Sequence, residues 1–183
     1  VDSRRLGPAE LRRIGYVSES QELPSGLTVT QLLAFVRPLY PAWDDTLARR
    51  MLTQFHIPSP RKIGTLSRGM RAKVALVSSL AYRPELLLLD EPFSGLDPNV
   101  REEMVDGILS LEAREGWSVL LSSHDIEEVE RLADRVAILD RGRLVLVEEI
   151  EALLARHRRV EIVAEQTEAH TENQALPDAW RAF

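Results

Sequence analysis

The chain has 183 residues, of which 44% are hydrophobic and 28% charged, and its formal net charge is −6. This composition fits one globular domain with a sizeable core, and no apolar run approaches the roughly 18 residues of a membrane-spanning helix. The acidic balance argues against nucleic-acid binding, and the absence of cysteine, together with an N-terminus that lacks an apolar signal segment, fits a cytoplasmic protein.

The first part of the chain is predicted to contain one strand followed only by helices. Residues 14–17 are apolar and partly β-branched, which is typical of a strand. Three helices are expected next, at about residues 30–39, 44–55 and 67–82, with Thr30, Asp44 or Asp45, and Ser67 as their N-caps. The stretch from about residue 20 to residue 83 is therefore interpreted as a helical insertion.

The second part of the chain alternates strands with helices. Residues 85–89, ELLLL, form an unbroken apolar run, as expected of a parallel strand buried on both faces. Asp97 and Pro98 are typical of a helix start. Further strands are expected at residues 118–121, 136–139, 144–147 and 158–165, and further helices at about residues 125–133 and after Glu149. This order favours a layered α/β core.

The strongest chemical signal is the run LLLLDEP at residues 86–92. Asp90 and Glu91 follow the predicted buried strand, at the carboxyl end where open α/β sheets bind ligands. One acid can hold Mg²⁺, usually through water, because a hard cation prefers oxygen ligands. The next can orient and deprotonate a water for in-line attack on a phosphoryl group. The alternative is a solvated Asp-Glu pair at a strand end.

A histidine follows the next predicted strand, in the run SSHD at residues 122–125. At the end of a neighbouring parallel strand, His124 can lie beside the same γ-phosphate and sense whether it is present. Taken alone, His124 is better interpreted as a surface histidine. A Ser-His-Asp hydrolase triad at residues 123–125 is excluded, because triad members must converge in space.

Four motifs in order, LSRGM, LLLLDEP, SGLD and SSHD, resemble those of an ATP-binding cassette (ABC) ATPase domain. The resemblance covers residues 12–147. It implies an α/β, P-loop NTPase-like (RecA-like) fold, with a parallel-sheet core and a helical subdomain at about residues 20–83. We therefore expect an ABC ATPase domain at residues 1–147, followed by a C-terminal extension at residues 148–183.

The stretch GTLSRGMR has the glycine spacing of a phosphate-binding loop, G-x-x-x-x-G-K-[ST], but Met70 and Arg71 stand where a lysine and a hydroxyl are needed. The resemblance makes LSRGM the family signature, usually LSGGQ. Ser67 and the amides around Gly69 then form an anion-binding helix N-terminus that caps the γ-phosphate of the partner subunit's ATP. Arg68 either adds positive potential there or is a solvated arginine. With Met70 it gives a variant that resembles exporter-type ATPases.

The resemblance implies roles for further residues. They are Asp90 as the Mg²⁺-binding aspartate, Glu91 as the general base, His124 as the switch histidine, and Asp97 as the aspartate that crosses the dimer interface. In GYVSES, where the family usually has GYVPQ, Glu19 is the expected second Mg²⁺ ligand, ahead of Gln21.

The sequence contains no phosphate-binding loop, because neither Lys62 nor Lys73, its only lysines, is followed by Ser or Thr. In family members that loop lies upstream of the segment that matches Val1. We therefore expect the sequence to be a fragment that lacks its N-terminal strands, which would leave the strand at residues 85–89 partly unpaired. We also expect the fragment itself not to bind MgATP.

The function implied is the ATP-hydrolysing motor subunit of an ABC membrane transporter, using ATP and Mg²⁺. Its expected partners are a second ABC ATPase subunit, in a head-to-tail homo- or heterodimer, and a membrane-spanning permease, with no nucleic acid. The permease would hold it on the inner face of the cell membrane. Two alternatives are a non-transport ABC ATPase and a non-catalytic remnant or regulatory partner that contributes only its signature motif. His157 and His170 have no second ligand at metal-binding spacing, so no metal is assigned there.

Overall fold

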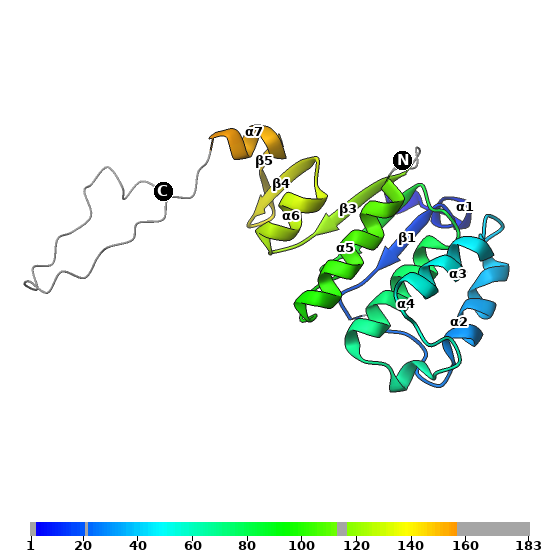
Figure 1. The fold of residues 1–183 in the computed structure, drawn as a ribbon. Coiled ribbons are helices and arrows are strands. Elements are labelled where there is room, and N and C mark those ends of the chain that lie inside the picture. The colour runs from blue at the N-terminus through cyan, green and yellow to red at the C-terminus, as the bar shows by residue number, and fades with distance from the viewer. Residues whose placement is uncertain (1–2, 21, 113–116, 157–183) are drawn as a thin grey trace, which may run out of the picture.

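A parallel sheet lies at the centre of the computed structural model, which describes residues 3–20, 22–112 and 117–156 (Figure 1). Its three strands, β1 Ile14–Val17, β2 Leu86–Asp90 and β3 Ser118–Ser122, lie in the order β1-β2-β3. The parallel α/β core is thus confirmed. The expectation that residues 85–89 are partly unpaired is wrong, because β2 pairs with β1 on one side and with β3 on the other.

Seven α-helices are found in the described residues. They are α1 Pro8–Leu11, α2 Val29–Val36, α3 Asp45–Gln54, α4 Arg68–Leu80, α5 Pro98–Glu112, α6 Ile126–Leu132 and α7 Ile150–Arg156. Short 3-10 helices occur at Ser3–Arg5, Arg37–Leu39 and Ile63–Thr65. Between β1 and β2 the α-helices α2, α3 and α4 follow one another, as the predicted helical insertion requires.

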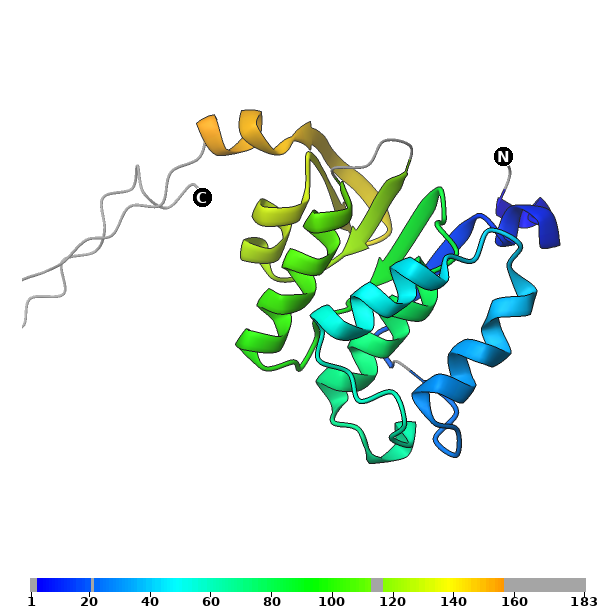
Figure 2. The ribbon, with the colours of Figure 1, turned by 45° about the vertical axis from the view of Figure 1, so that its right-hand side comes forward.

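The sheet is covered on one face, by α4 and α5 (Figure 2). Leu87 and Leu89 of β2 are buried on that side, together with Val17 of β1. On the opposite side Tyr16 and Leu120 are 54% and 64% exposed. The burial on both faces that the ELLLL run predicts is therefore found on one face only in the described residues.

The helix starts follow local side-chain hydrogen bonds. Asp44 caps α3, since its Oδ1 accepts from the amides of Thr46 and Leu47 at 2.8 and 2.9 Å. The pKa of the Asp44 carboxyl lies below its ordinary value, mainly because of the hydrogen bond from the Leu47 amide and secondly because of the hydrogen bond from Arg83. The expected cap Thr30 is wrong. Thr28 caps α2, because its Oγ1 accepts from the Gln31 amide at 3.2 Å while Gln31 Oε1 accepts from the Thr28 amide at 2.9 Å.

The last described part is an antiparallel hairpin of β4, Arg135–Asp140, and β5, Arg143–Glu149. Arg141 and Gly142 make its turn with φ values of 47° and 75°, as a two-residue hairpin loop requires. The domain boundary expected at residue 147 falls inside β5. The strand expected at residues 158–165, with His157 and His170, lies outside the described residues. No helix in the described ranges is long and apolar enough to cross a membrane.

Candidate functional site

The acids of LLLLDEP lie at the carboxyl end of β2, where Ser122 of β3 stands opposite Asp90. The Ser122 hydroxyl donates to Asp90 Oδ1 at 2.8 Å. Its oxygen accepts a hydrogen bond from the Glu91 amide at 3.0 Å. Ser122 therefore holds both acids in place. It had no role in the sequence interpretation. The signal that would have identified it is the strand register, which places the last residues of β2 and β3 side by side.

Glu91 has an unusual backbone and a specific side-chain partner. Its φ is 45°, in the left-handed region that residues other than glycine rarely adopt. Such strain persists where the surroundings impose it, commonly at functional sites. The Glu91 carboxylate lies 2.8 Å from Nδ1 of His124, whose side chain is 79% exposed. The structure thus brings together the predicted base and the predicted switch histidine.

Glu19 lies beyond the end of β1, and its Oε1 accepts a hydrogen bond from Ser94 at 3.2 Å. The oxygen ligands of Glu19 and Asp90 suit Mg²⁺. Within the described ranges, however, no group of three or more His, Asp or Glu side chains is placed to hold a metal ion. These carboxylates would therefore supply only part of a coordination shell. The alternative residue Gln21 lies outside the described residues.

The signature residues form the start of α4, which has 13 residues. Ser67 is its N-cap, and its hydroxyl oxygen accepts from the Met70 amide at 3.2 Å. Gly69 is buried against α5, so closely that a Cβ there would lie 2.7 Å from Cγ1 of Val100. The N-terminus of α4 is therefore held in place by α5.

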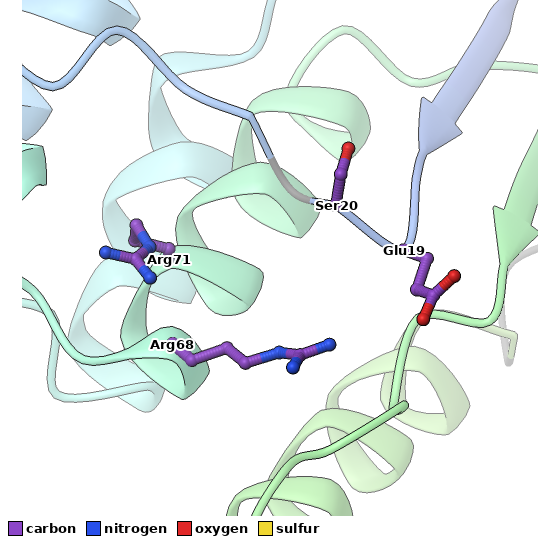
Figure 3. Close-up of a pocket in the computed structure, with 4 residues that line it drawn as sticks. All are labelled: Glu19, Ser20, Arg68 and Arg71. Atoms are coloured by element: carbon purple, nitrogen blue, oxygen red, sulfur yellow. The ribbon is translucent and has the colours of Figure 1, made fainter.

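A hollow of about 380 Å³ separates the signature from the end of β1 (Figure 3). Its lining residues are Glu19, Ser20, Arg68 and Arg71. The Arg68 guanidinium points across it (Figure 3), and a Cβ at Gly95 would lie 2.8 Å from its Nη1. Arg68 is therefore in contact with the SGLD segment and brings positive charge to the hollow that Glu19 faces. Ser20, Gly95 and Arg71 had no role in the sequence interpretation.

Asp97 begins α5. Its Oδ1 accepts from the Asn99 amide at 3.0 Å, and its backbone carbonyl accepts from the Arg101 amide at 3.0 Å. The side chain is exposed, so it can also meet a partner. The described site therefore has two parts: the carboxyl ends of the strands, with Glu19, Asp90, Glu91 and His124, and the N-terminus of α4, which Arg68 links to the SGLD segment.

Residues 31–130 match the sequence profile of the family described as "AAA domain, putative AbiEii toxin, Type IV TA system". The chain is 30% identical over 155 residues to the ABC transporter ATP-binding protein YtrB of Bacillus subtilis (strain 168), with 85% of this chain and 53% of that protein covered. It is 37% identical over 158 residues to the aliphatic sulfonates import ATP-binding protein SsuB 1 of Nocardia farcinica (strain IFM 10152), with 86% of this chain and 64% of that protein covered.

A solved structure, "Structure of ATP binding subunit of ABC transporter", superposes with a TM-score of 0.71 and 26% identity over 81% of this chain and 64% of that one. The chain spans about half the length of YtrB. The profile match at residues 31–130 includes the ends of β2 and β3 and the signature helix α4. The chain belongs to the AAA-domain family that this profile describes, and the relatives and the superposed structure support its membership of the ABC transporter ATP-binding domains.

Proposed function

We propose that these residues belong to the motor subunit of an ABC membrane transporter and carry part of its ATP-hydrolysing site. The observation that supports this most is the Glu91–His124 pair. A glutamate held at φ 45° directs its carboxylate to an imidazole nitrogen 2.8 Å away, at the ligand-binding edge of the sheet. Strained backbone of this kind clusters at functional sites, and a hydrolytic centre needs both groups at one place.

Glu91 is proposed as the general base. Its carboxylate would accept a proton from the water whose oxygen bonds to the γ-phosphorus, as the bond from that phosphorus to the β–γ bridging oxygen breaks and ADP leaves. His124 would face the γ-phosphate from the neighbouring strand end. Asp90 and Glu19 would hold Mg²⁺, which when bound neutralises charge on the phosphate oxygens. Ser122 holds Asp90 and Glu91 in place, because its hydroxyl donates to the Asp90 carboxylate and accepts from the Glu91 amide.

The start of α4 is proposed to act on the nucleotide of a second ABC ATPase subunit. Ser67, Gly69 and Met70 would present the helix N-terminus to that subunit's γ-phosphate, and Asp97 would cross the head-to-tail interface. Ser67→Arg should then abolish hydrolysis while each monomer still binds ATP. Loss of ATP binding by the monomer would show that this helix end serves its own nucleotide.

A permease is the proposed membrane partner, and it would place the subunit on the inner face of the cell membrane. Export is the proposed direction, because Arg68 and Met70 give the signature variant that resembles exporter-type ATPases. SsuB 1, in contrast, is named for import. The phosphate-binding loop expected upstream of Val1 stays a prediction, and the coding sequence that precedes this segment tests it.

The decisive experiment is Glu91→Gln in the whole protein that contains these residues. ATP binding should be retained, hydrolysis should fall by roughly 10² or more, as loss of a general base does, and a nucleotide-bound dimer should accumulate. The matched control is Glu102→Gln on the exposed face of α5, which should hydrolyse ATP at the normal rate. Near-normal turnover by Glu91→Gln would remove Glu91 from the role of base.

A further inference from the structure

A polar cluster joins α5 to the segment that carries His124. Arg101 of α5 places Nη1 2.5 Å from Asp125 Oδ2 and 3.2 Å from Glu128 Oε1. The Ser123 hydroxyl donates to Glu128 Oε2 at 2.5 Å, and its oxygen accepts from the Asp125 amide at 3.0 Å. Both sequence neighbours of His124 are therefore tied into one network that ends on Arg101.

The network has the features of a specific arrangement rather than a solvated ion pair. The Glu128 side chain is only 7% exposed, so its charge needs a partner to be tolerated. Arg101 is that partner. Its pairing costs free energy, because the Arg101 Nε is buried and has no hydrogen-bond partner among the described residues. Desolvation raises the pKa of Asp125, but hydrogen bonds from the Glu127 amide and Arg101 outweigh it and lower the pKa below its ordinary value.

His124 itself lacks packing that would hold it. Its side chain is 79% exposed, so apart from its contact with Glu91 its position depends on the backbone of residues 123–125. That backbone is held by Ser123, which bonds to Glu128, and by Asp125, which pairs with Arg101 and also caps α6 through the Glu127 amide. We propose that Arg101 is the positioning residue for His124, because it holds the segment that keeps the imidazole 2.8 Å from Glu91. This inference rests on the proposed function.

The test compares Arg101→Gln with the matched control Arg131→Gln in the whole protein. Arg131 of α6 also reaches α5, where it lies 3.9 Å from Glu102 and 3.4 Å from Asp106, and among the described residues both of these ion-pair partners lie outside the His124 segment. Arg101→Gln should lower kcat for ATP hydrolysis by about tenfold to a hundredfold, as a small misplacement of a reacting group does, with KM nearly unchanged. Arg131→Gln should leave both constants unchanged.

Two further measurements separate positioning from a general structural role. In a His124→Ala background, Arg101→Gln should cause no further loss of kcat, because the effect of Arg101 passes through His124. A full additional loss would overturn the inference. Arg101→Lys should recover part of kcat, since an ammonium keeps the charge but lacks the planar fork.

A spectroscopic measurement keeps the inference testable without hydrolysis. The imidazole ¹⁵N signals of His124 should shift in Arg101→Gln and stay unchanged in Arg131→Gln; unchanged signals in both variants would overturn the inference. If Arg101→Gln does not fold, Ser123→Ala takes its place, because it breaks the same network. If Glu91→Gln retains turnover, the proposed function fails, while the His124 signals still decide whether Arg101 positions this histidine.

Discussion

Gly69→Ala tests whether the N-terminus of α4 is held by α5. A Cβ at this position would lie 2.7 and 3.1 Å from the two Cγ atoms of Val100, and a β-branched side chain in a helix has little freedom to rotate away. Overpacking of this kind costs about 1–3 kcal/mol. Alanine recovers about 1 kcal/mol through its higher helix propensity. The net expectation is a loss of roughly 1 kcal/mol in the free energy of unfolding.

The same substitution in a Val100→Ala background isolates the contact. With the Cγ atoms removed, only the helix propensity remains, so Gly69→Ala should now stabilise the chain by up to about 1 kcal/mol. Urea denaturation followed by circular dichroism measures all four members of this cycle. Gly26→Ala is the control, since a Cβ there meets nothing within 4 Å. An equal effect of Gly69→Ala in both backgrounds would refute the close packing of α4 on α5.

Three further outcomes are expected. Asp44→Ala removes the α3 cap and should cost about 0.5–2 kcal/mol at pH 7. Because the pKa of Asp44 is lowered in the folded state, this contribution exists above about pH 4 and should vanish as the pH falls through the lowered value in denaturation series. Gly107→Ala should destabilise by about 1–3 kcal/mol, since its Cβ would lie 2.4 Å from Cζ of the buried Phe55, and Phe55→Leu should relieve it. Calorimetric titration of residues 1–183 with MgATP should show no binding with a Kd below about 100 μM, which corresponds to a binding free energy of roughly 5.5 kcal/mol.

The features that the sequence predicted depend on short-range chemistry. Ser67 and Asp44 cap their helices because a hydroxyl or carboxylate next to the first turn accepts its free amides. The same reasoning named Thr30, although Thr28, two residues earlier, is the same residue type and also precedes the apolar run. Only the exchange of hydrogen bonds between Thr28 and Gln31 distinguishes them, and that pairing could have been read as a capping box.

The features that the sequence did not predict depend on register and packing. Asp90 and Glu91 were expected at a strand end, yet the role of Ser122 follows only from its pairing with Asp90 across β2 and β3. The left-handed φ of Glu91 leaves no trace in residue type. Arg101 and Glu128 belong to different helices, and their ion pair forms only when those helices pack. The pattern of residues along the sequence does not predict such contacts between separate elements.

Helix α5 is the element on which both parts of the site depend. Val100 meets Gly69 at the start of α4, and Arg101 meets the segment of His124. Farther along, Glu103 places Oε2 2.5 Å from Lys73 of α4, whose side chain is 8% exposed. Because α5 begins directly after SGLD, any movement of that segment along the helix axis would act on the α4 N-terminus and on the histidine together. The start of α4 and the segment that carries His124 are therefore both anchored on α5, which favours their moving together.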